Sequence, residues 1–118
     1  MIDITTMTPL ERQFHKECLD GSETLRKLHK YNPTYFSQMV HEHGGVGAVR
    51  LLLKSPNFQD GLTSLWEIGQ LDFSIEVAVL NPKWSSLFTL AEKREAKKRL
   101  TALGYTPKFT KNMTSELK

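Results

Sequence analysis

Two histidines separated by one residue, His41 and His43, are the side chains in this sequence that most suggest a pair of metal ligands. Side chains two positions apart on a helix project about 200° from each other, so the pair cannot hold one metal ion on a regular helix. Fraying near Gly44 would relax that geometry, but no further cluster of ligand residues lies close in the sequence. We therefore expect no metal and no cofactor, and interpret both imidazoles as solvated groups at a helix C-terminus.

The glycine-rich stretch from Gly44 to Gly47 has some similarity to a phosphate-binding loop. Such loops follow a strand, and the Walker form opens its helix with Lys-Ser or Lys-Thr, whereas here a helix is expected before the glycines and Ala48 follows them. A tight turn between two helices is the favoured interpretation. The alternative is an anion site at the free N–H groups of a helix that begins near Val46, with Arg50 one turn further on.

The two tryptophans are expected to have different roles. Trp66 lies on an apolar helical stripe and is expected in the core, as is usual for such a residue. Trp84 follows Pro82 and Lys83 in a connector, where it could instead line an exposed groove. Glu67 has no second carboxylate at a spacing that suggests acid–base chemistry. With no nucleophile–base set either, we expect a protein without catalytic residues that is not an enzyme.

Five basic side chains crowd one predicted helix over residues 90–103: Lys93, Arg94, Lys97, Lys98 and Arg99. We place all five on its outer face. Three interpretations remain open for this face. Glu92 and Glu95 could neutralise it within the helix, leaving a solvated surface; it could contact phosphates with help from Lys108 and Lys111; or it could bind an acidic protein.

Composition points to an ordinary folded domain. The chain of 118 residues is long enough for one hydrophobic core and too short for two. Its hydrophobic fraction of 39% and charged fraction of 25% are typical of globular proteins. Apolar runs are far too short to span a bilayer, and the N-terminus has no signal-peptide pattern. Cys18, the single cysteine, cannot form an internal disulfide and is expected to pack inside. We expect a cytoplasmic protein without membrane contact.

The net charge of +3 is unevenly distributed along the chain. Residues 59–88 carry one base and four acids, whereas residues 89–118 carry eight bases and three acids. The basic character therefore belongs to the last quarter of the chain, next to an acidic middle.

Start and stop signals predict a series of short helices. Thr8 and Thr89 each precede a glutamate by three residues, the spacing of a capping box. Asn32 before Pro33 indicates another N-terminus, and glycines follow several apolar stretches as they do at helix ends. The expected helices cover about residues 9–30, 33–43, 46–54, 60–68, 74–80 and 90–103.

The segment from Ser74 to Leu80 is ambiguous because its β-branched residues also suit a strand. A lone strand has no partner elsewhere in the chain, so we favour a helix. The predicted fold is all-α: a compact single-domain orthogonal bundle of five or six short helices over residues 8–105, with an N-terminal extension over 1–7 and a polar tail over 106–118. The expected core contains Leu10, Phe14, Phe36, Val40, Leu52, Leu65, Trp66, Val79 and Leu100.

The order of certain residues resembles that of a small bacterial all-helical module, which occurs alone or as the tail of larger proteins, some of them associated with nucleases or defence. The resemblance covers about residues 8–105 and implies a helical fold and a cytoplasmic setting. It implies no activity and no catalytic residue. The residues that carry it are Tyr31-Asn32-Pro33, Phe36, Met39-Val40, Gly44-Gly45, Leu62, Leu65-Trp66-Glu67, Gly69, Leu71-Asp72, Glu76 and Leu103-Gly104-Tyr105.

These observations predict a protein that acts by binding. The first hypothesis is a non-catalytic cytoplasmic accessory module that contacts a protein partner through an apolar and basic groove. The alternative is a nucleic-acid-binding domain that uses the same basic helix, with weak affinity. Neither the partner nor the oligomeric state follows from the sequence. The candidate binding residues are Arg50, Trp84, Lys93, Arg94, Lys97 and Lys98.

Overall fold

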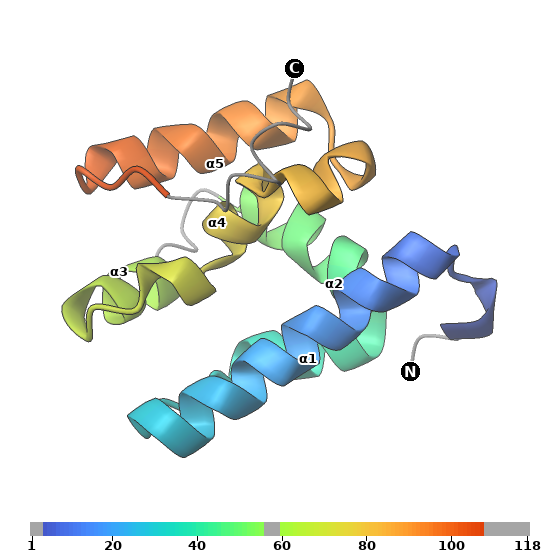
Figure 1. The fold of residues 1–118 in the computed structure, drawn as a ribbon, viewed down its shortest axis with the longest axis horizontal. Coiled ribbons are helices and arrows are strands. Elements are labelled where there is room, and N and C mark those ends of the chain that lie inside the picture. Colours follow the sequence, from blue (N-terminus) through green and yellow to red (C-terminus); the bar gives the residue numbers. More distant parts are fainter. Residues whose placement is uncertain (1–3, 56–59, 108–118) are drawn as a thin grey trace. The chain divides into compact units, whose positions relative to one another are not determined.

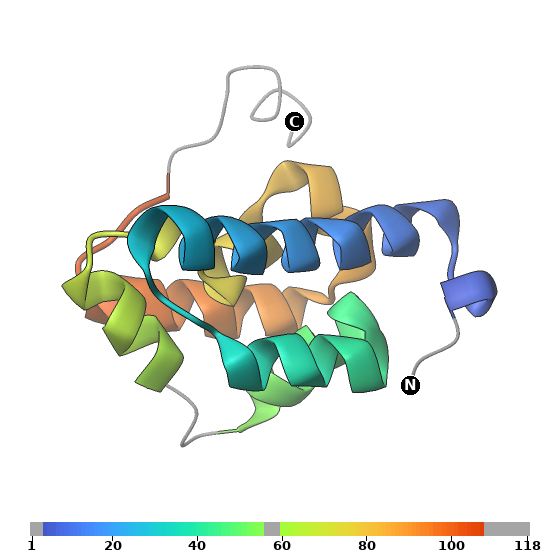
Figure 2. The same cartoon turned by 90° about the horizontal axis from the view of Figure 1, so that it is seen from below.

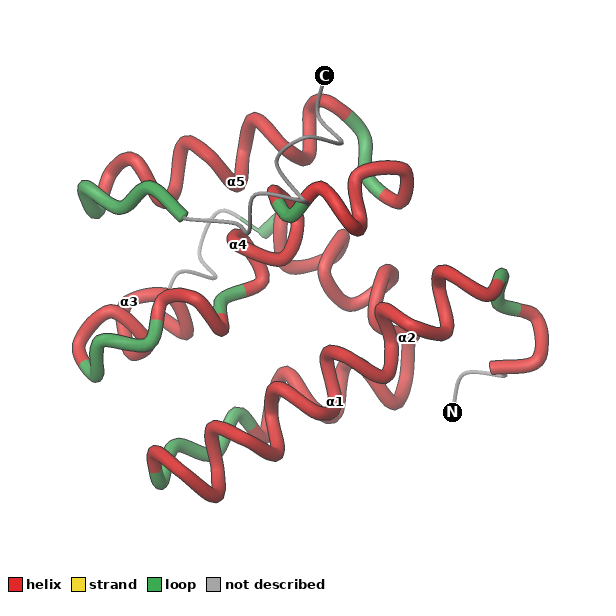
Figure 3. Tube along the Cα trace, viewed as in Figure 1, coloured by secondary structure: helices red, strands yellow, loops and turns green. Residues whose placement is uncertain are grey.

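The computed structural model describes residues 4–55 and 60–107, and every regular element within these ranges is helical (Figures 1 and 3). The predicted all-α fold class is confirmed. The chain divides into two compact units, Met1–Ser55 and Pro56–Lys118. The single domain over residues 8–105 stays a prediction. The elements are η1 (Ile4–Thr6), α1 (Pro9–His29), α2 (Thr34–Lys54), α3 (Asp60–Glu67), η2 (Leu71–Phe73), α4 (Ile75–Leu80), η3 (Pro82–Leu87) and α5 (Leu90–Ala102).

Helix α1 begins at the predicted capping box. The hydroxyl of Thr8 accepts a hydrogen bond from the backbone N–H of Glu11, whose carboxylate accepts one from the Thr8 N–H at 2.8 Å. The helix then continues without a break through Gly21. It ends at Lys30, which adopts the left-handed conformation (φ 54°) of many helix C-termini.

Helix α2 returns along α1 and packs against it (Figure 2). The predicted Asn32 cap is wrong: Pro33 occupies the N-cap position, where no side chain caps the helix, and the Asn32 carbonyl accepts instead from the N–H of Thr34. The helical geometry is interrupted at Gly44 (φ 80°, ψ 164°). The two predicted helices therefore exist as two halves of α2, joined at a residue whose backbone favours glycine.

The second unit is built from short elements that end at specific signals. Ser74 caps α4 by accepting from the N–H of Val77 at 3.2 Å, which confirms a helix where a strand was the alternative. Gly69 (φ 71°) and Gly104 (φ 69°) follow α3 and α5. Each forms a Schellman motif, in which the N–H of the next residue reaches back to the carbonyl of Leu65 or Leu100.

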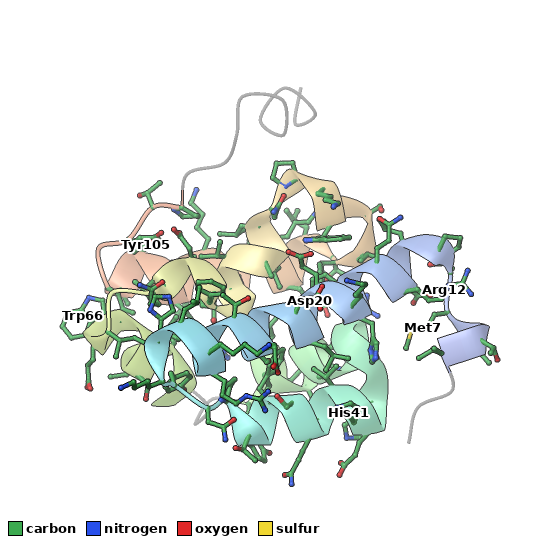
Figure 4. The ribbon with its side chains drawn as sticks, turned by 60° about the horizontal axis from the view of Figure 1, so that its bottom comes forward. Met7, Arg12, Asp20, His41, Trp66 and Tyr105 are labelled. Atoms are coloured by element: carbon green, nitrogen blue, oxygen red, sulfur yellow. The ribbon has the colours of Figure 1, made fainter. Side chains whose placement is uncertain are left out.

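Most of the expected core residues are buried: Phe14, Val40, Leu52, Leu65, Val79 and Leu100. Leu10 and Phe36 are half-buried. The prediction for Trp66 is wrong, because this side chain is 52% exposed. Leu62 and Leu65 define the buried face of α3. With a rotation of about 100° per residue, Trp66 lies about 70° around the helix axis from the midline between these two leucines. Figure 4 shows it projecting from the helix.

Candidate interaction surface

Helix α5 carries most of the predicted binding residues, and both of its ends are fixed. At the N-terminus, Thr89 and Glu92 form the second predicted capping box, with hydrogen bonds of 3.1 and 2.8 Å. Beyond the C-terminus, the hydroxyl of Tyr105 donates to the carboxylate of Asp72 in η2. This hydrogen bond, with smaller contributions from burial and from the Asp72 charge, raises the pKa of Tyr105 to about 12.

A buried ionic network fixes the rotation of α5 about its axis. Arg99 Nη1 lies 3.1 Å from Glu76 Oε2 of α4, and these two side chains are only 2% and 3% exposed. Arg99 Nε also donates to Glu95 Oε2 at 2.7 Å. Burial raises the pKa of Glu76, while its hydrogen bonds, including the one from Arg99, act in the opposite direction. The prediction that Arg99 lies on the outer face is therefore wrong.

Helical spacing explains the position of Arg99. It follows Ala96 by three residues, so the two side chains are neighbours on one side of the helix, and Ala96 is buried. Leu90, by contrast, lies about 120° from Ala96 around the helix and is exposed. Helical spacing in the sequence thus indicated the buried side of α5 for Arg99. The prediction was wrong because it placed Arg99 on the exposed face on account of its charge.

Three basic side chains remain exposed on the opposite side of α5: Arg94, Lys97 and Lys98. Their i, i+3, i+4 spacing makes them neighbours over about 6 Å of helix axis, and we call them the basic stripe. Within the described residues, no carboxylate forms an ion pair with any of the three. The acids of α5 are occupied elsewhere, Glu92 in the capping box and Glu95 with Arg99. Glu95 thus neutralises the buried Arg99, and within the described residues it forms no ion pair with the basic stripe.

Lys93 and Trp84 do not belong to this exposed surface. Lys93 is half-buried, and its Nζ donates to Ser85 Oγ of η3 at 2.7 Å. Trp84 is 3% exposed, with Lys83 Nζ 4.8 Å from its ring centroid. The expected connector is in fact the 3-10 helix η3, capped by Asn81, and it directs Trp84 inward. The expectation that Trp84 lines an exposed groove is wrong. Lys108 and Lys111 lie outside the described residues.

The glycine-rich stretch is a kink within α2. The N–H of Gly45 donates to His15 Nδ1 of α1 at 3.1 Å, and Gly44, Gly45 and Val46 are buried. Arg50 is half-buried. The pKa of Glu11 is lowered chiefly by its hydrogen bonds with Thr8 and to a smaller extent by the charge of Arg50. Because one N–H group is already bonded to His15, the stretch offers fewer free donors to an anion than the sequence suggested.

The exposed histidines of α2 do not gather with other ligands. His43 Nε2 lies 3.7 Å from Glu42 Oε2. In the part of the chain that the structure describes, no three His, Cys, Asp or Glu residues are grouped so that they could hold a metal ion. His41 (Figure 4) borders a cleft of about 270 Å³ between α1 and α2 whose charged residues, Glu23 and Arg26, pair with each other.

Cys18 on α1 is a weak nucleophile in this fold. Burial, with a smaller contribution from the charge of Glu17, raises the pKa of its thiol to about 12. A thiol with such a pKa carries almost no thiolate near neutral pH, and the thiolate is the reactive form. Cys18 is half-buried, so it packs inside only in part.

Comparison with known protein families, curated proteins and solved structures found no match to this chain. The resemblance to a bacterial helical module accordingly stays a prediction. Among the described helices, none combines the length and the apolar character needed to cross a lipid bilayer.

Proposed function

We propose that this protein is a non-catalytic accessory module of the cytoplasm that binds an acidic protein partner through the basic stripe of α5. The supporting observation is that Arg94, Lys97 and Lys98 are exposed side by side without a carboxylate partner among the described residues. Charged side chains at a rim raise the association rate and select partners of opposite charge. The network around Arg99 supports this role because it keeps the stripe on the outer face of α5.

Binding of nucleic acid is the second candidate, since the same three cations can contact phosphates. Three phosphate contacts give a slope of about −2.7 for log affinity against log salt, or a loss of about 40-fold between 50 and 200 mM. Readers of nucleic acid that make 6–10 such contacts have much steeper slopes. We therefore rank nucleic acid second and expect the isolated protein to bind it weakly and without sequence preference.

Charge reversal on the full chain tests the proposal. The variant Lys97→Glu/Lys98→Glu should lose a partner that wild-type protein captures from its native cells, as identified by mass spectrometry, with or without nuclease treatment. The matched control is Lys16→Glu/Lys27→Glu, which makes the same change in net charge at exposed positions of α1. It should retain the partner, because the exposed ion pairs that it breaks are worth little.

Salt titration separates the two candidates. Capture that is lost after nuclease treatment, together with binding to DNA or RNA that weakens log-linearly with salt, would favour nucleic acid. Equal capture by the stripe variant and by wild-type protein would refute both candidates, because neither would then depend on the stripe.

A further inference from the structure

The two helices of the first unit come close together at Gly45. A Cβ atom added to this residue would lie 2.9 Å from the Cα of His15 and 3.1 Å from Cδ2 of Phe14, so only glycine fits without displacement. At the same point the N–H of Gly45 donates to His15 Nδ1 at 3.1 Å. The preceding residue, Gly44, has the positive φ that divides α2 into two halves. A close backbone approach, a hydrogen bond and a kink therefore coincide.

This hydrogen bond requires a neutral imidazole. A histidine nitrogen accepts a hydrogen bond only while it carries no proton, so Nδ1 must be bare and the proton must reside on Nε2. Protonation would place an N–H group on Nδ1 opposite the N–H of Gly45. That contact is relieved only if the ring turns away or the helices separate, and either change breaks the hydrogen bond.

The surroundings of His15 also disfavour its charged form. Burial is the main cause that lowers its pKa, and the charge of His41 on α2 adds to it. Gly45 begins the second half of α2, whose N-terminal end is the positive end of the helix dipole. Glu11 of α1 and Arg50 of α2 also interact electrostatically across this pair of helices. The 3-10 helix η1 before α1 has no titratable side chain.

We propose that His15 and Gly45 form a pH-sensitive latch between α1 and α2, closed while the imidazole is neutral and released when it is protonated below neutral pH. Such a latch converts a change in pH into a change in the packing of the first unit, because the kink at Gly44 lies directly beside the bond that is lost. The latch lies in the first unit and the basic stripe in the second.

The variant His15→Asn gives a specific test, because Asn Oδ1 branches from the same carbon as His Nδ1 and accepts a hydrogen bond at every pH. Amide exchange of Gly45, followed by NMR on the full chain, should show a protection factor that falls in the wild-type protein between pH 7.5 and 5. Because protonation of one imidazole drives the opening, the fall is at most about tenfold per pH unit. The Asn variant should show a much smaller fall.

His43→Asn is the matched control, since it removes an exposed histidine of α2 and should keep the wild-type response. Equal pH responses of wild-type protein and His15→Asn would overturn the proposal. Should the Asn variant fail to fold, ¹⁵N shifts of the wild-type histidines provide the second measurement. A protonated Nδ1 on His15 at pH 7.5, or a Gly45 amide that does not follow the titration of His15, would overturn it as well.

Discussion

Removing the guanidinium of Arg99 should strongly destabilise the second unit. The variant Arg99→Met leaves the carboxylate of Glu76 buried, with 3% of its side chain exposed, and without its cation. Breaking a buried ion pair from one side costs about 3–5 kcal/mol, because the remaining charge is neither hydrated nor paired. Glu95 adds little to this loss, since its side chain is 34% exposed and can turn toward water.

The double variant Glu76→Leu/Arg99→Met should recover most of that stability. It replaces both charges by apolar side chains, and such replacements of buried pairs are often neutral or stabilising. The two changes should therefore be strongly non-additive in a double-mutant cycle. Lys97→Met is the matched control on the exposed side of α5 and should change the free energy of unfolding by less than about 0.5 kcal/mol.

Urea unfolding followed by tryptophan fluorescence measures these effects. Both tryptophans of the chain lie in the same unit as Arg99, so the signal reports on the unfolding of that unit. The pKa of Glu76 is already raised by burial and should rise further in Arg99→Met. A raised pKa in the folded state means that stability is lost as the pH rises through that pKa. The destabilisation should accordingly be largest at pH 7–8 and shrink in acid.

Two results would refute this reasoning. One is a loss below about 1 kcal/mol for Arg99→Met at pH 7.5, which would mean that the Glu76 carboxylate is hydrated or already protonated. The other is a double variant as unstable as the single one, which would show that Arg99 acts through its packing and not through its charge.

Three further pairs of changes test the packing. Gly45→Ala should cost about 1–3 kcal/mol because its Cβ meets the backbone of α1. Gly47→Ala should be nearly neutral, because the gain in helix propensity offsets a 3.3 Å contact of the new Cβ. Chemical unfolding followed by circular dichroism compares the two variants. Trp84→Ala should cost about 3–5 kcal/mol as a buried residue, and Trp66→Ala about 1 kcal/mol or less, as thermal unfolding would show. Thr89→Ala should cost about 1 kcal/mol of cap energy, and Thr89→Ser should restore it in the same assay.

The amino-acid sequence determined the local structure of this protein. Capping boxes at Thr8 and Thr89, and the glycines after α3 and α5, act within a few residues of themselves, so their signals can be read without any tertiary contact. The same holds for α4, where the cap at Ser74 outweighed the β-branched residues that follow it. The all-α class follows from these signals together.

Tertiary structure alone decided how several side chains are used. Helical spacing places Arg99 on the buried side of α5, but its pairing with Glu76, 23 residues away on α4, follows from no local pattern. Trp66 is exposed and Trp84 buried because burial depends on the elements packed against each residue, and not on apolar character alone. No sequence pattern singles out His15, because the group that donates a hydrogen bond to it, the N–H of Gly45, lies 30 residues further along the chain.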